Sequence, residues 1–592
     1  MSEPIAVLEP RTDAASNISA GHVCPPSGIR QFRLLVAHLL DRFVNNETLS
    51  VSGETLPFVM TVAGAIAVPT LIASIFVFPE YHAFPPKPPL PNFWTQLCEH
   101  YFFTVYGMVA MGLITVFEAD LFFPEALDTL ILSPLPIPRG RLALARVCAN
   151  LIFLVLLLLG TNLFTVIAYP PITELHVGRL FLANLSAVLA GAVFAAAACV
   201  ALQGLLSCLV PTGRYAQATA LLQCGTTAAL MSTFLTMPKL FPLLERLTAD
   251  PRASWFPPFW FLGLYESMLA GPARLPRFAP LAALALWATG IAIVSAMVCF
   301  PLAFRRRSRQ AIEGAGVINL ESSASRWAAV VLHRTLLRSP QQRAVYHFLS
   351  QSLRTPKHRV YLAMYSGLGL GLIVSGVLRV TLDGGAVRFA TDSRAIAAMM
   401  PGVAFWTVAG LCFVLASSVD PRGGWVFPVT SGLPTAAQLD AVRLWVTLWT
   451  VVISGGVIAV AAALLPAELH GAALLAQILI AVALSVLLPD LFLFDARVIP
   501  FTSVRIPVNT DLAWMLLRYI LFLPVTVYAA IRLEAWAEHS AIHLAAIAVG
   551  VLLLHSSIRE ASHRALQLRA SRSDVDQMTG MLPGLGLAGE LE

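Results

Sequence analysis

Apolar residues in this sequence come in blocks of about 20, separated by shorter polar stretches. A block of that length crosses the ~30 Å hydrocarbon layer of a membrane as a helix. The blocks predict spans at about 57–79, 101–118, 143–169, 180–210, 216–237, 279–304, 360–381, 395–418, 441–465, 469–494, 511–531 and 541–557. The expected fold is all-α: a polytopic membrane bundle of about 12 transmembrane helices in two six-helix halves.

An amphipathic stretch precedes the first span. In residues 31–50, Leu35, Leu39 and Phe43 fall on one side of a helix, and Arg33 lies beside them. This pattern is typical of a helix that lies along the membrane surface. Residues 1–30 are polar and contain several Pro, Ser and Gly, so we expect a disordered tail there.

A basic stretch divides the chain into two halves. Residues 305–359 carry eleven Arg or Lys against two Glu, so the positive-inside rule predicts a cytoplasmic linker. The domains expected from this division are a first membrane half at 51–304, a second half at 360–558 and a C-terminal tail at 559–592. Six spans on either side of the linker make both termini cytoplasmic.

The loops on the other side are expected to be external. Residues 80–100 are rich in Pro, whereas 239–278 holds five basic residues against the rule. That second loop also contains the aromatic run 255–265, and aromatic side chains favour the membrane interface. It is therefore predicted to form short helices on the outer leaflet.

The two halves show a faint internal similarity. Residues 117–136 and 415–434 each run from the end of a second span through acidic and Pro positions to Leu-Pro, 298 residues apart. Since each half has an even number of spans, such repeats would be parallel, related by an axis along the membrane normal.

Composition agrees with lipid as the main solvent. The chain is 57% hydrophobic and 12% charged, with a mean hydropathy of +0.75, and a soluble domain carries about twice that charge. The net charge of +6 comes mainly from Arg beside apolar blocks, which indicates orientation and argues against nucleic-acid binding. The eight Cys are scattered without a CxxC pair, so we expect neither disulfides nor a metal centre.

Energy from ATP would have to be supplied by another subunit. A P-loop requires a Gly-Lys pair, but Lys87, Lys239 and Lys357 each follow a Pro. We therefore expect no cofactor in this chain. His539 and His543 have a spacing that could bind a metal, although a solvated helix end is the favoured interpretation.

The most informative stretch is 118–146, a short excursion between the second and third spans. Its marked residues are Glu118, Asp120, Asp128, Leu130, Ile131, Leu132, Leu135, Pro136, Arg139, Arg141 and Arg146. A plain inner loop with positive-inside charges would explain the arginines. The four apolar residues are unusual for an exposed loop, so we expect them to be buried against the membrane surface, the linker or a partner.

At these residues the sequence resembles the permease subunits of ABC-2 type exporters. The resemblance rests on an acidic residue, an apolar stretch, Leu-Pro, a basic turn and a return into the membrane, preceded by an amphipathic helix. In the second half the matching region includes Asp420, Trp425, Leu433, Pro434 and, loosely, Arg443. The resemblance implies that both excursions couple to a cytoplasmic ABC ATPase subunit that binds ATP-Mg. The usual family member has six spans and pairs as a dimer, whereas this chain carries both halves.

The leading hypothesis is thus an exporter permease in the cytoplasmic (inner) membrane, surrounded by lipid and moving an unknown small-molecule or lipid-like substrate. One alternative is an ion-coupled secondary transporter with six-plus-six topology. Another is a membrane enzyme or scaffold, with a sparse set of inner carboxylates as its only candidates: Asp420, Asp490, Asp495 and Asp511.

Overall fold

The computed structural model describes residues 28–44, 70, 72, 93–118, 135, 137–173, 177–250, 254–269, 275–313, 334–337, 339–383, 386–391, 393–416, 435–464, 471–494, 500–501 and 509–584. Most of the predicted first span, 57–79, lies outside this set.

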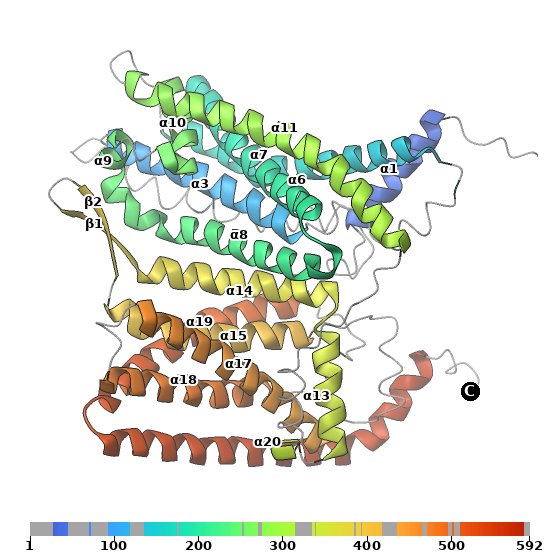
Figure 1. Cartoon of the computed structure of the whole chain (residues 1–592), viewed down its shortest axis with the longest axis vertical. Helices are drawn as coiled ribbons and strands as arrows, with labels where there is room; N and C mark the ends of the chain where they lie inside the picture. The colour runs from blue at the N-terminus through green and yellow to red at the C-terminus, as the bar shows by residue number, and fades with distance from the viewer. Residues whose placement is uncertain are drawn as a thin grey trace, which may run out of the picture.

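Long helices running in roughly the same direction make up most of the molecule (Figure 1). The first part contains α1 (Gly28–Val44), α3 (Phe93–Phe117), α6 (Arg139–Thr173), α7 (Val177–Leu209), α8 (Thr212–Leu240), the 3-10 turn η4 (Phe241–Leu243), α9 (Leu244–Ala249), α10 (Pro257–Leu269) and α11 (Leu275–Glu313). The second part contains α13 (Pro340–Ser352), α14 (Pro356–Val377), β1 (Leu378–Asp383), β2 (Ala386–Thr391), α15 (Ser393–Ala416), α17 (Ala436–Leu464), α18 (Gly471–Phe492), α19 (Asn509–Ala537) and α20 (Ala541–Gly584).

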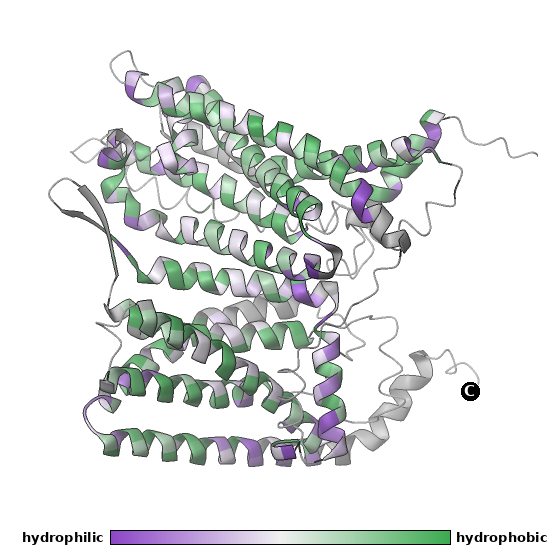
Figure 2. Ribbon diagram, in the orientation of Figure 1, coloured by the Kyte–Doolittle hydropathy of each residue, from purple (hydrophilic) through white to green (hydrophobic). Residues whose placement is uncertain are grey.

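The chain has the helices of a multi-pass membrane protein. In the described residues, ten helices are long and apolar enough to cross a membrane: α3, α6, α7, α8, α11, α14, α15, α17, α18 and α20. Predicted span 511–531 falls within α19, which is helical but not among those ten. Hydrophobic residues occupy the middle of the long helices and polar residues gather toward their ends (Figure 2).

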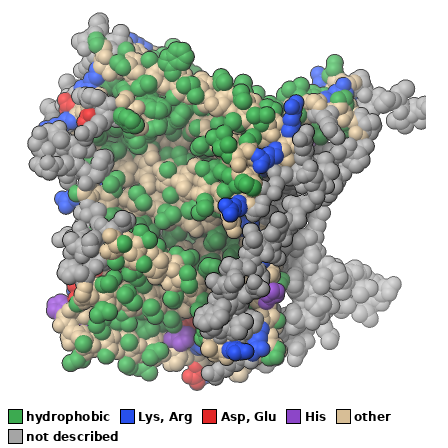
Figure 3. Space-filling model, in the orientation of Figure 1, with side chains coloured by type: hydrophobic (Ala, Val, Ile, Leu, Met, Phe, Trp, Pro, Cys, Tyr) green, Lys and Arg blue, Asp and Glu red, His purple; other side chains and the backbone are tan. Residues whose placement is uncertain are grey.

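Lipid-facing surfaces explain why these helices expose large apolar side chains. Trp287, Ile291 and Met297 on α11, and Leu552 and Leu553 on α20, are all more than three-fifths exposed. Hydrophobic side chains also cover much of the face shown in Figure 3. Such surfaces would be unstable in water, whereas a bilayer solvates them readily.

The two halves share one pattern of helix contacts. In the first half, α7 packs against α3, α6 and α11, and α3 also contacts α6 and α8. In the second half, α18 packs in the same way against α15, α17 and α20, and α15 also contacts α17 and α19. Each of these helices of the first half therefore has a counterpart with the same contacts in the second, while the internal repeat itself stays a prediction.

Each half also has an amphipathic helix packed on its predicted third span, α6 or α17. The predicted helix at 31–50 is observed as α1, whose Leu35 and Leu39 are buried against α6 in a cluster with Ala149 and Phe153. Its counterpart is α13, within the linker, which packs on α17. Helix α13 is an addition to the elements expected from the sequence.

A local signal for α13 exists in the sequence. The Ser339 side chain accepts a hydrogen bond from Gln342 N, and the Gln342 side chain accepts one from Ser339 N, with Pro340 at the first helical position. This is a capping box, which the residue types and their spacing are enough to indicate. Leu349 is then fully buried, and Trp445 Nε1 donates to Ser350 Oγ at 3.1 Å.

The ends of the bundle differ. The η4–α10 segment and the β-hairpin lie at one end, and α1 and α13 lie at the other (Figure 1). The predicted opposition between 239–278 and the linker is therefore seen in their described parts. Short helices are present in 239–278 as expected, but α10 is packed against α3, α7 and α11 and has a mostly buried surface.

The predicted span 360–381 extends too far. Its helix, α14, ends at Val377, and the chain continues as the antiparallel hairpin β1–β2, in which Asp383 pairs with Ala386. Apolar and polar residues alternate along Leu378–Asp383, and its Val380 and Thr381 are residue types that favour a strand. The Gly-Gly pair at 384–385 is a hairpin signal in the sequence.

The tightest seam between the halves joins α8 to α14. Gly367 lies so close to α8 that a Cβ atom would come within 2.6 Å of Thr227 Cβ and 2.7 Å of Cys224 O. Lys239 Nζ, at the far end of α8, donates to Ser375 O at 2.5 Å and to Leu378 O at 2.9 Å. Because Gly367 has no side chain, α8 and α14 can approach each other closely. At the end of α14, the Lys239 ammonium group binds the backbone carbonyls.

We expect Gly367→Ala to destabilise the protein by about 1–3 kcal/mol, because its methyl group would meet backbone and Cβ atoms that cannot swing aside. Gly376→Ala, in the same helix, is the matched control, since a Cβ there meets nothing within 4 Å. Thermal unfolding of the purified variants measures both effects. Equal stability of the two would contradict the close seam.

Candidate functional site

The predicted coupling residues of the first half are only partly described. Glu118 lies at the end of α3, with its backbone N–H donating to Ile114 O. Leu135 is 46% exposed just before α6. Arg139 begins α6. The remaining members lie outside the described residues: Asp120, Asp128, Leu130, Ile131, Leu132 and Pro136.

Two of the arginines predicted to couple to the ATPase partner instead make contacts within this chain. Arg141 Nη1 donates to Gln31 Oε1 of α1 at 2.5 Å, which fastens the amphipathic helix to α6. Arg146 is buried in the bundle. These contacts give both residues a role in packing, and leave Leu135 as the described apolar residue available to a partner.

In the second half, Arg443 is the described member of the predicted set. Asp420, Trp425, Leu433 and Pro434 lie outside the described residues. Arg443 is the eighth residue of α17, and Arg146 is the eighth residue of α6. Both arginines are buried, so the loose sequence match between them corresponds to the same place in equivalent helices.

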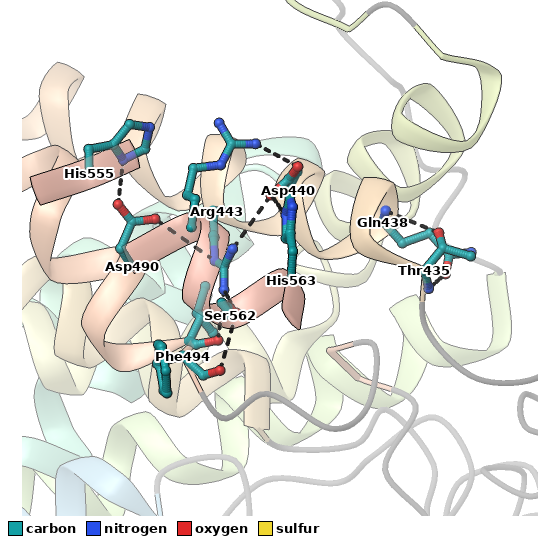
Figure 4. Close-up of polar contacts among 11 residues, drawn as sticks. Thr435, Gln438, Asp440, Arg443, Asp490, Phe494, His555, Ser562 and His563 are labelled. Carbon is teal, nitrogen blue, oxygen red and sulfur yellow. Dashed lines mark hydrogen bonds and ion pairs between the residues drawn. The ribbon is translucent and has the colours of Figure 1, made fainter. Parts of the chain in front are cut away.

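Arg443 is the centre of an ionic network that joins three helices (Figure 4). Its Nε lies 3.9 Å from Asp490 Oδ1 on α18, and its Nη2 donates to Ser562 Oγ on α20 at 2.5 Å. His555, also on α20, places Nδ1 2.5 Å from the other Asp490 oxygen, Oδ2. Ser562 Oγ in turn donates to Phe494 O at 3.3 Å.

Asp440 extends the network along α20. Arg443 Nη1 is 3.5 Å from Asp440 Oδ1, and His563 Nε2 is 3.2 Å from the same oxygen. Arg559 Nη2 is 2.5 Å from Asp440 Oδ2. Two carboxylates and two guanidinium groups balance one another, and each carboxylate oxygen has a basic neighbour.

Burial makes this network costly to break. The side chains of Asp490 and Arg443 are only 1% and 5% exposed, whereas Arg559 is 38% exposed. Removing one member of a buried pair leaves the other charge without compensation, at a cost of about 3–5 kcal/mol. The network therefore fastens α20 to α17 and α18, mainly through Asp490 and Arg443.

These contacts bear on the enzyme alternative. Among the catalytic candidates, Asp490 is the inner carboxylate with a described side chain; His555 lies 2.5 Å from one of its oxygens, and Arg443 lies 3.9 Å from the other. In the described structure Asp490 is therefore an ion-pair partner of Arg443 and His555. Asp420 and Asp495 lie outside the described residues, and so does the side chain of Asp511.

The predicted sixth span of the first half, α11, is fastened differently. Arg306 of α11 donates through Nη1 to Cys208 O and through Nη2 to Val210 O, the latter at 3.1 Å. Arg307 lies over the Tyr215 ring, 4.9 Å from its centroid. Carbonyl groups at the end of α7 carry partial negative charge, so a guanidinium group can bind them in place of a carboxylate.

A buried ionisable pair at the other end of the bundle is not evident from the sequence. His100 Nδ1 of α3 is 2.5 Å from Glu266 Oε1 of α10, and both side chains are at most 5% exposed. The His100 ring also stacks on Tyr265 at 4.0 Å. The pair holds α10 inside the first half, and the 166-residue separation leaves no local signal for it.

No group of three or more His, Cys, Asp or Glu side chains suited to a metal occurs among the described residues. His539 Nδ1 lies 2.6 Å from Ala535 O, and His543 Nδ1 lies 2.9 Å from Trp536 O. Both imidazoles therefore bind backbone carbonyls at a helix end.

Comparisons with family models, with curated proteins and with solved structures find no match. Fold and site together define a class: a multi-pass α-helical membrane protein, whose two halves share a packing pattern and whose polar networks fasten helix ends.

Proposed function

We propose that this chain is the membrane-spanning subunit of an ABC-2 type exporter, with two halves of six spans each. A separate cytoplasmic ATPase would bind ATP-Mg and supply the energy. The membrane would be the cytoplasmic (inner) membrane, with α1, α13, the linker and both termini on the cytoplasmic side. The substrate would be an unknown small or lipid-like molecule.

One observation carries the proposal: each half has an amphipathic helix packed on its third span, at the same end of the bundle. Gln31 of α1 contacts Arg141, and Gln341 of α13 accepts a hydrogen bond from Thr435 at 3.4 Å. Arg141 and Thr435 stand where the chain returns from the two excursions. A partner that binds this end could therefore push on both halves through equivalent elements.

The mechanism we propose is alternating access. Movement of the ATPase would press on 118–146 and 419–443, and the third spans would transmit that movement to α7 and α18, which pack against them. The Arg443 network would make α17, α18 and α20 move together, because breaking it costs several kcal/mol. The halves would then tilt about a central path.

Purification of the full chain with its genomic neighbours tests the proposal. We expect an ATPase with a P-loop to co-purify, and its hydrolysis rate to rise when the permease is present in proteoliposomes. Transport that runs on a proton or sodium gradient without ATP would count against the exporter and favour the secondary transporter. A protein that purifies without any ATPase would also contradict the proposal.

A further inference from the structure

A buried carboxyl group near the end of α19 takes no part in the sites above. Glu534 is 5% exposed and lies beyond the predicted span 511–531, three residues before α19 ends. The adjoining ends of α18, α19 and α20 meet in an apolar cluster of Ala476, Ala537 and Ile547. Glu534 therefore belongs to the end of the bundle where the hairpin lies (Figure 1).

Two buried oxygen atoms at this place lack a hydrogen-bond donor among the described residues: Glu534 Oε2 and Gln477 Oε1 of α18. The Gln477 amide is oriented by Ile396, whose carbonyl accepts a hydrogen bond from Nε2 at 3.4 Å. A buried acceptor without a donor costs about 1–3 kcal/mol, and more if it is charged.

Within the described part of the chain, no positive charge is placed to stabilise an ionised Glu534. Glu538, one turn further along α19, is exposed and has the same sign, and Arg532 is also exposed. His539 of α19 and His543 of α20 direct Nδ1 to backbone carbonyls. Helix α18 places the neutral Gln477 side chain near Glu534. Helix α15 contributes the Ile396 carbonyl, which accepts a hydrogen bond from Gln477.

Two other buried carboxylates in the described residues have basic partners: Asp490 has Arg443, and Glu266 has His100. Burial raises the pKa of the Glu534 carboxyl to about 7. A hydrogen bond with the Gln477 side chain lowers this pKa in part, and the negative charge of Glu538 raises it further. Desolvation without a cation favours the neutral acid.

We infer that Glu534 is a proton-binding site, loaded from the aqueous phase at its end of the membrane while α18 and α19 are packed together. One proton binds the Glu534 carboxylate. The resulting O–H group supplies a hydrogen-bond donor at a place where Glu534 Oε2 and Gln477 Oε1 both lack one. Separation of α18 from α19 would hydrate the group and release the proton to water. The site needs no ATPase partner, so it stands independently of the proposed function.

Linkage gives the sign of its effect on stability. The folded state holds the proton more tightly than the unfolded state, whose Glu pKa is about 4.3. The stability that protonated Glu534 contributes to the folded state is fully present below about pH 4.3 and is lost as the pH rises through about 7. Across this window the unfolding equilibrium should shift by roughly a few hundredfold toward the unfolded state.

Thermal unfolding of the purified full-length chain between about pH 4 and pH 8 tests this dependence. Glu534→Gln should remove the part of the pH dependence that lies in the window and should be more stable than the wild type at the alkaline end. Glu538→Gln is the matched control: it should keep most of the wild-type profile, with the upper end moved slightly to lower pH because the Glu538 charge adds to the rise in the Glu534 pKa. A Glu534→Gln profile that matches the wild type would overturn the proposal.

A second measurement needs no variant. Apolar carbodiimides react with protonated carboxyl groups, so peptide mapping of the labelled wild-type chain reports on Glu534 and Glu538 together. Labelling of Glu534 at neutral pH, falling as the pH rises, is expected, with little labelling of Glu538. Should Glu534→Gln fail to fold, this comparison decides: equal pH profiles at the two residues, or no labelling of Glu534, would overturn the inference.

Discussion

Replacing Leu132 and Leu135 together by Asp is expected to weaken ATPase association more than a hundredfold while the permease still inserts in the membrane. Leu135 is exposed at the end of the bundle that carries α1. If it docks into a groove, a buried unpaired carboxylate at the contact costs ~3 kcal/mol, which is a factor of more than about 100 in affinity. Co-purification and ATPase stimulation in proteoliposomes measure the loss.

Insertion should survive because the two residues lie outside the predicted spans, whose apolar length is unchanged. Trp255→Asp is the control, since Trp255 is an 86% exposed apolar residue at the opposite end. It should keep normal association. If the double variant also binds and stimulates the ATPase normally, the coupling role of 118–146 is wrong, and the loop should be reassigned to the bilayer surface or the linker.

Asp490→Asn is expected to destabilise the protein by about 3–5 kcal/mol, because it leaves the Arg443 guanidinium buried without its α18 partner. The His555 contact on the other oxygen would be altered by the same change. Thermal or denaturant unfolding of the purified chain measures the effect, and α20 should become the first helix exposed to proteolysis.

Glu560→Gln provides the matched comparison. Glu560 pairs with Arg564 at 2.5 Å, but both side chains are more than three-fifths exposed, so its loss should cost at most about 1 kcal/mol. A combined Arg443→Met, Asp490→Leu variant should recover part of the stability, since no charge is then left buried alone. Wild-type stability in Asp490→Asn would show that the network does not fasten α20.

Sequence patterns locate a span well where polar residues bound the apolar block on both sides. The block predicted at 143–169 is α6 at Arg139–Thr173, and 395–418 is α15 at Ser393–Ala416. The span predicted at 360–381 is too long because Leu378 and Val380 continue the apolar block of α14, although both residues belong to strand β1. Hydropathy alone does not distinguish a strand from a helix over so few residues.

The candidate site is predictable only in part. The sequence pattern indicates Arg141 and Arg146 as coupling residues, yet packing directs one to Gln31 and buries the other. Asp490 lies near a predicted span end, where water would be expected to solvate it. In the fold, α17 and α20 cover that end and exclude water from it.

What the sequence determined by itself is the class of protein and the position of most spans. In lipid each helix must satisfy its own backbone hydrogen bonds, so a span is a local property of about 20 residues. The tertiary structure alone decided which polar side chains meet. Arg443, Asp490 and Ser562 are separated by tens of residues, and Glu534 has no distinctive neighbours in sequence. Burial and partnership depend on which helices pack together, and that is a long-range property of the chain.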